Sequence, residues 1–68
     1  MFEVITKAGR VIPGTRIRIL HLEDRYSPEP YEGREGVVKY IDSLGQLHGT
    51  WGGLAVIPET DEIEILSK

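Results

Sequence analysis

The sequence contains no cysteine, and its 68 residues include only one tryptophan, one phenylalanine and one methionine. The lack of cysteine excludes disulfides and thiolate zinc sites, and it suits a reducing compartment such as the cytoplasm. The chain also lacks the positive charge of a typical nucleic-acid binder, because 8 Lys and Arg stand against 11 Asp and Glu, for a net charge of −3. A chain of this length forms one domain with one small core.

Long apolar runs are missing as well. The longest is the four residues 54–57, far short of the roughly 20 that a membrane helix needs. The first residues show no basic region followed by an apolar stretch of signal-peptide length. No window carries three turns of helical periodicity, and there is no internal repeat. We therefore expect a soluble, cytoplasmic protein without helices and without contact to membranes.

Short stretches rich in β-forming residues recur along the chain, separated by Gly and Pro turns. This spacing predicts an all-β fold, a small five-stranded antiparallel SH3-like barrel, with an OB-type barrel as the alternative. We expect a single domain over 1–68, with the barrel in 13–66 and a strand or hairpin extension in 1–12. The five predicted barrel strands are 15–22, 35–41, 46–51, 54–57 and 62–65. The expected core is Ile17, Ile19, Val38, Ile41, Leu47, Leu54, Val56, Ile63 and Ile65.

The first barrel strand carries a break in its pattern. Arg16 and Arg18 alternate with two isoleucines, which is typical of a half-buried strand. Towards Leu20 and Leu22 the apolar residues change face. The sequence therefore predicts a bulge or a sharp bend there, because either would turn Leu22 back to the core.

Turn glycines and expected core residues follow one another in a characteristic order, formed by Gly14, Thr15, Arg16, Leu22, Asp24, Tyr26, Gly33, Gly36, Val38, Ile41, Asp42, Gly45, Trp51, Gly53, Leu54 and Asp61. This order resembles a small bacterial and phage domain family of unknown function, number 4314. The resemblance covers roughly residues 13–66 and implies no assigned enzymatic activity and an association with phages and mobile elements.

Catalytic residues are not evident. A nucleophilic serine needs a neighbouring base and an orienting group, whereas Ser27, Ser43 and Ser67 lie in a loop, a predicted turn and the tail. Glu62 and Glu64 are predicted on the solvated face of a strand. We therefore expect no enzymatic activity and no cofactor.

The two histidines are the candidates for metal binding. His21 and Glu23 share one face of a strand, and His48 lies on another strand. Two ligands do not make a zinc site, which takes three or four. We expect these histidines to be surface residues and predict no metal site.

The long polar segment 23–33 is the best candidate for binding a protein partner. It combines aromatic rings with prolines, and such residues contact a partner at low entropic cost. We expect Trp51 to border the same surface, although these rings would equally serve as plugs for the open end of a barrel. The candidate residues are Arg25, Tyr26, Pro28, Pro30, Tyr31 and Trp51.

Two further functions stay open. The first is a nucleic-acid-binding barrel that uses an arginine face made of Arg16, Arg18, Arg25 and Arg34. Against it, Arg16 and Arg18 are expected to pair across the sheet with Glu62 and Glu64. The second is a structural subunit of a larger assembly, in which the segment 2–12 pairs with a neighbouring chain.

Overall fold

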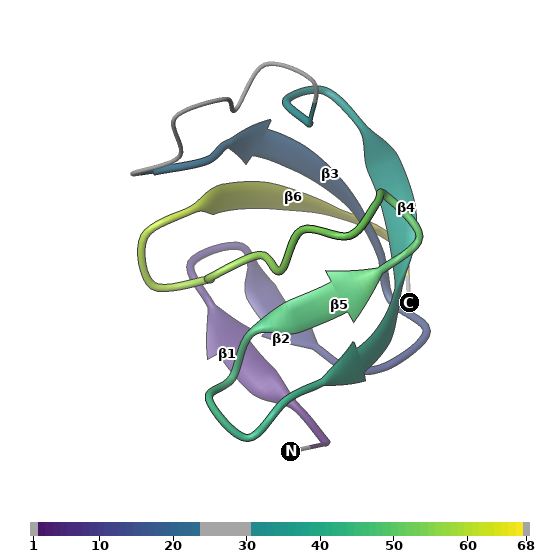
Figure 1. The fold of residues 1–68 in the computed structure, drawn as a ribbon. Helices are drawn as coiled ribbons and strands as arrows, with labels where there is room; N and C mark the ends of the chain where they lie inside the picture. The colour runs from purple at the N-terminus through teal and green to yellow at the C-terminus, as the bar shows by residue number, and fades with distance from the viewer. Residues whose placement is uncertain (1, 24–30, 68) are drawn as a thin grey trace.

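The computed structural model describes residues 2–23 and 31–67, and within them the fold is all-β (Figure 1). β4 is the longest strand with seven residues and is rich in β-branched ones, whereas β3 and β6 have six residues each and alternate isoleucine with charged residues. The six strands are β1 (Val4–Thr6), β2 (Gly9–Val11), β3 (Arg16–His21), β4 (Glu35–Ile41), β5 (Leu47–Gly49) and β6 (Glu62–Ser67).

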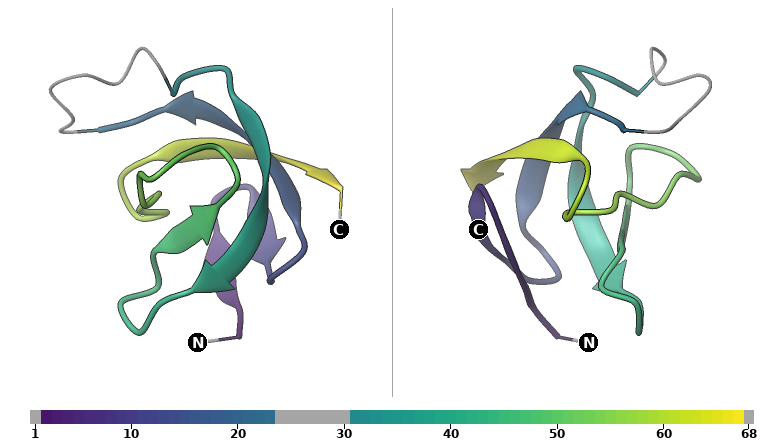
Figure 2. Two further views of the ribbon diagram at one scale, coloured as in Figure 1. Left: turned by 45° about the vertical axis from the view of Figure 1, so that its right-hand side comes forward. Right: turned by 90° about the vertical axis from the view of Figure 1, so that its left-hand side faces the viewer.

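The strands form two antiparallel sheets. The larger sheet has the order β5-β4-β3-β6, and β1 pairs with β2 in a separate hairpin. Figure 2 shows how strongly β4 curls across the large sheet, with the hairpin lying at its lower end. This curvature lets one small sheet fold around its own apolar face.

The core lies on the concave side of the large sheet. Inward residues of β3, β4, β5 and β6 meet one residue of the hairpin and three residues from connecting segments. Leu54 and Ile65, which we expected in the core, are half-buried and pack against it. The buried residues are Val11, Ile17, Ile19, Leu22, Val38, Ile41, Leu47, Trp51, Val56 and Ile63.

The predicted irregularity in the first barrel strand is confirmed. The register between β3 and β6 shifts between Ile19 and His21, so that β3 has one extra residue, Leu20, at this point. Leu20 consequently faces solvent with 46% of its surface exposed, whereas Leu22 is buried at 2%.

The turn predicted at 42–45 is present as well. The N–H of Gly45 donates to the Asp42 carbonyl at 3.0 Å, and Gly45 has a φ of +83°. Asp42 accepts the N–H groups of Leu44 and Gln46 through Oδ1 at 2.9 and 3.0 Å. This side-chain turn explains why an aspartate begins the segment and a glycine ends it.

The prediction of a strand at 54–57 is wrong. It is reduced to a single antiparallel bridge between Val56 and Leu47, and the strand expected at 46–51 extends only over β5. The described strands therefore form two sheets, and closure into a five-stranded barrel stays a prediction. Among the described residues, no helix is long and apolar enough to cross a membrane.

Candidate functional site

The base of the segment 23–33 is held together by one aromatic ring and one cation. Tyr31 is half-buried, and its ring packs closely over Gly52, where a Cβ would lie 2.9 Å from Tyr31 Cε1. The guanidinium carbon of Arg34 lies 5.0 Å from the centre of the Tyr31 ring, a distance at which a cation is attracted to the ring face. Arg34 also donates a hydrogen bond of 2.7 Å to the carbonyl of Trp51. Tyr31 is thus held from two sides, by Gly52 and by Arg34.

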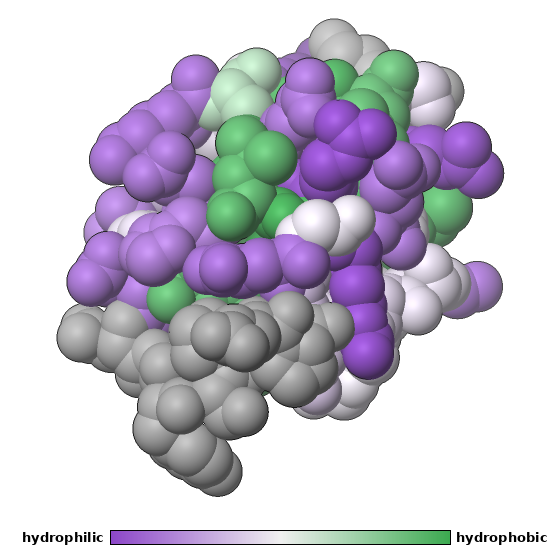
Figure 3. All heavy atoms as spheres, turned by 90° about the horizontal axis from the view of Figure 1, so that it is seen from above, coloured by the Kyte–Doolittle hydropathy of each residue, from purple (hydrophilic) through white to green (hydrophobic). Residues whose placement is uncertain are grey.

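Four of the predicted partner-binding residues, Arg25, Tyr26, Pro28 and Pro30, lie outside the described residues. Tyr31, which is half-buried, is the candidate of this segment that lies within the described residues. The face of the molecule seen in Figure 3 mixes hydrophobic areas (green) with hydrophilic side chains (purple).

Trp51 is in the core, so its assignment to the binding surface is corrected. Only 2% of the residue is exposed, and its indole N–H donates to the Leu54 carbonyl at 2.7 Å. Two glycines make room for the ring: a Cβ on Gly36 would lie 3.0 Å from Trp51 Cε3, and one on Gly49 would overlap the six-membered ring. The strand residues beside the indole therefore have to be glycine.

The arginine face expected for nucleic acid is largely occupied by internal contacts. Arg18 donates to Glu64 at 2.7 Å and to Glu35 at 2.9 Å, so that two carboxylates surround one cation. The hydrogen bond to Glu35 is the main reason why the pKa of Arg18 is raised. The pairing with Glu64 is one that the sequence predicted, whereas Glu62 lies opposite His21 in the sheet register.

Arg16 and Arg34 complete the arginine set within the described residues. Arg34 is engaged with Trp51 and Tyr31, as described above. The exposed side chain of Arg16 makes no ion pair with the described part of the chain. The structure therefore does not bring these arginines together as one free basic surface.

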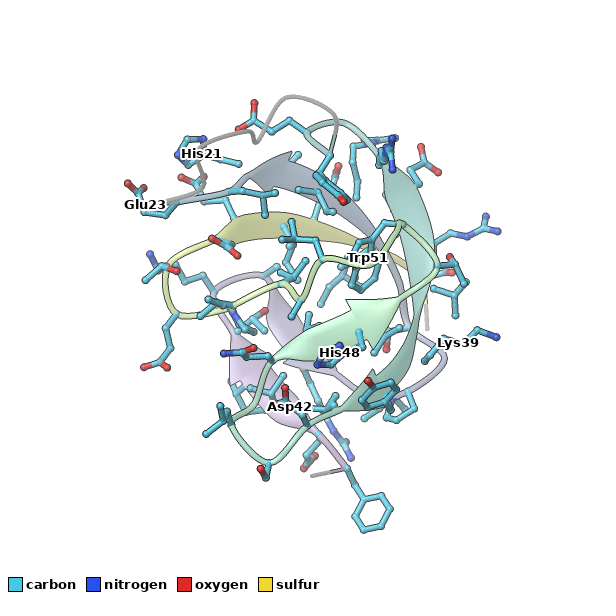
Figure 4. The ribbon with its side chains drawn as sticks, in the orientation of Figure 1. His21, Glu23, Lys39, Asp42, His48 and Trp51 are labelled. Atoms are coloured by element: carbon cyan, nitrogen blue, oxygen red, sulfur yellow. The ribbon has the colours of Figure 1, made fainter. Side chains whose placement is uncertain are left out.

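The two histidines lie at separate places, as Figure 4 shows, and each contacts carboxylates of its own. His21 Nδ1 lies 3.0 Å from Glu32 Oε2 and its Nε2 lies 3.4 Å from Glu23 Oε2. The hydrogen bond to Glu32 is the main cause of a raised pKa of His21. Among the described residues, no group of three or more His, Cys, Asp or Glu is arranged to hold a metal ion.

His48 belongs to the β4–β5 hairpin. Its Nε2 lies 2.8 Å from Asp42 Oδ2, and its ring stacks on Tyr40 with centroids 4.4 Å apart and planes 3° apart. The hydrogen bond from His48, followed by the one from the Gln46 N–H, lowers the pKa of Asp42. These contacts stiffen the hairpin and leave the exposed Tyr40 with one covered face.

Asp61 is a structural residue whose role as a buried acceptor was not predicted from the sequence. Its carboxylate, 3% exposed, accepts the N–H of Glu23 through Oδ1 and the N–H of Ile57 through Oδ2, both at 2.8 Å. It thereby joins the start of the segment 23–33 to the turn before β6. The available signal was an aspartate in the Pro-containing turn 58–61, because turn aspartates often accept backbone N–H groups.

These features define a small all-β domain in which the half-buried ring of Tyr31 lies against Gly52 and Arg34. A family model described as "Domain of unknown function (DUF4314)" matches residues 7–66. The chain therefore belongs to this family, as the resemblance in its turn glycines and core residues implied. Searches of curated proteins and of solved structures find no match.

Proposed function

We propose that this domain is a non-enzymatic interaction module, folded as a small SH3-like β-barrel, that binds a protein partner through the segment 23–33. The module would act in the cytoplasm, and the family resemblance suggests that phages or mobile elements encode it. The proposed contact surface centres on Tyr31 and continues into Arg25, Tyr26, Pro28 and Pro30. Trp51 supports this surface from the core through its carbonyl, which accepts the Arg34 hydrogen bond.

The observation that carries the proposal is the fixed position of Tyr31. Ordering a side chain on binding costs free energy, and a ring that is already held between Gly52 and Arg34 avoids much of this cost. Tyrosine and arginine are also the residue types that contribute most often to protein interfaces. A half-exposed, braced Tyr–Arg pair therefore favours protein recognition over a purely structural role.

Nucleic-acid binding is the weaker alternative. Phosphate contacts require cations that are free to meet the backbone. Arg18 is surrounded by Glu35 and Glu64, and the overall charge of −3 repels polyanions.

The proposal is tested with the full chain as bait, using the wild type, Tyr31→Ala and the matched control Tyr40→Ala. Tyr40 is a tyrosine with more exposed surface, at 55%, and it lies on the β4–β5 hairpin. A protein captured from the native host by the wild type is identified, purified and titrated against all three chains by calorimetry. We expect Tyr31→Ala to weaken this binding at least about 10-fold, since a central tyrosine contributes roughly 2 kcal/mol, and Tyr40→Ala to bind normally.

Thermal unfolding of the three chains is measured alongside. Equal binding by Tyr31→Ala and the wild type would exclude Tyr31 from the interface. A collapse of its melting temperature would show instead that the ring is needed for folding, which removes the reason for the proposal.

A further inference from the structure

β1 is an edge strand within the described residues. It pairs with β2 through Val4–Val11, Ile5–Arg10 and Thr6–Gly9, and it has no partner strand on its other side. In an antiparallel pair, every second residue directs its N–H and C=O away from its neighbour. Such an edge is a template for another strand unless the protein protects it.

Apolar side chains without cover gather around this edge. Phe2 is 89% exposed, Ile5 71% and Leu44 75%. An open groove of about 280 Å³ runs between β1 and the residues around Leu44 and Pro58. It is lined by Val4, Ile5, Thr6, Lys7, Leu44, Gly45, Ile57, Pro58 and Glu59. Exposed apolar surface beside an unpaired strand edge indicates an interface.

The charges on either side of β1 point to its partner. Glu3 directly precedes β1, and Lys7 directly follows it as the first residue of the turn to β2. An antiparallel pairing of two β1 strands centred on Ile5 therefore brings Glu3 of each copy next to the end of β1 where Lys7 of the other copy begins its turn. We propose that the domain forms a two-fold symmetric dimer with a second copy of itself through this β1–β1 pairing. This inference goes beyond the proposed function and uses a different part of the molecule, because β1 belongs to the separate β1–β2 hairpin, whereas Tyr31 lies between β3 and β4 of the large sheet.

The side chains in this register complement each other. Ile5 meets Ile5 of the second copy, which covers its exposed surface. Lys7 makes no ion pair with the described residues of its own chain. Glu3 accepts from Arg10 at 2.7 Å, yet its side chain stays 45% exposed and has room for a second cation.

The neighbouring registers lack this complementarity. A pairing centred on Val4 places Ile5 opposite Glu3, and one centred on Thr6 places it opposite Lys7. Each would set an apolar residue against a charge twice, because the symmetry repeats every contact. The charge pattern therefore selects Ile5 as the centre.

A charge-swap experiment tests the dimer. Sedimentation and light scattering of the full chain, from micromolar to millimolar concentrations, measure the self-association of the wild type, Glu3→Lys and Lys7→Glu. Each variant turns two attractive pairs into two repulsive ones, and we expect it to raise Kd about 30-fold, about 2 kcal/mol at about 1.4 kcal/mol per tenfold. An equal mixture of the two variants restores both pairs and is expected to associate like the wild type. Lys39→Glu, the same charge change on an exposed lysine of β4, is expected to leave association unchanged.

Ile5→Asn is a second test that leaves the charges intact, and its loss of the central apolar pair is expected to weaken association. A wild type that stays monomeric at millimolar concentration would overturn the proposal. So would a dimer that tolerates Lys7→Glu and Ile5→Asn, or variants that fail to associate when mixed although each is folded by circular dichroism. Equal weakening by Lys39→Glu would show a general effect of charge and would also overturn it.

Discussion

Replacing Asp61 by asparagine tests how much one buried carboxylate contributes to this small domain. Asp61 accepts two N–H groups, from Glu23 and from Ile57, each at 2.8 Å. Asparagine has nearly the same shape, but it carries one acceptor oxygen and an NH₂ group that donates. Asp61→Asn therefore keeps one of the two hydrogen bonds and sets a donor against the other N–H.

The expected loss follows from these contacts. A hydrogen bond to a charged group contributes about 1.5–3 kcal/mol, and a buried donor without a partner costs about 1–3 kcal/mol. We expect the free energy of unfolding to fall by about 3 kcal/mol. For a domain of this size, that change lowers Tm by about 12–24 °C, at about 4–8 °C per kcal/mol.

Urea unfolding followed by tryptophan fluorescence measures this loss, because Trp51 is the single tryptophan and lies in the core. Glu59→Gln is the matched control: it also neutralises a carboxylate, two residues away, but on an exposed side chain. We expect this control to change stability by less than about 0.5 kcal/mol. An equally small change for Asp61→Asn would refute the assignment of Asp61 as the residue that joins the two segments.

Two further predictions concern pH and packing. The pKa of His21 is raised from 6.5, chiefly by the hydrogen bond to Glu32, so the stability that protonated His21 contributes is full below pH 6.5 and is lost as the pH rises through the raised value. Unfolding of the wild type and of His21→Gln at acid and at alkaline pH measures this contribution. A stability difference between the two chains that is the same at both pH values would contradict the prediction. Gly49→Ala would push a methyl group into the Trp51 ring, so we expect a strong loss of stability and a red-shifted emission. Gly53→Ala is its control, because nothing lies within 4 Å of that Cβ; equal stability of the two variants would contradict the packing argument.

The fold class and the longest strands could be predicted because their signals are local. Period-2 alternation identified β3 and β6, and the change of face between Leu20 and Leu22 located the bulge. The turn at Asp42 was visible from its aspartate and glycine. The segment 54–57 looks like a strand by composition, but pairing depends on what lies beside it, and only Val56 reaches Leu47.

The candidate site could be predicted only in part. Whether Trp51 faces the core or a partner depends on the room left by Gly36 and Gly49, which belong to neighbouring strands. The partners of Arg18 depend on the strand register. Glu64 lies opposite Arg18 in β6, next to the register shift between Arg16 and Ile17, and Glu35 lies opposite Arg18 in β4. Such relations arise only when strands distant in sequence meet.

The pairing of β3 with β6 also determines when this domain can begin to fold. It joins Arg18 to Glu64 across 46 residues, so the inner strand β3 cannot gain its second partner before β6, the last described strand, is available. Such non-local pairing slows folding, because a long loop must close before its contacts form. During synthesis the domain is therefore expected to fold in one step, once β6 has left the ribosome.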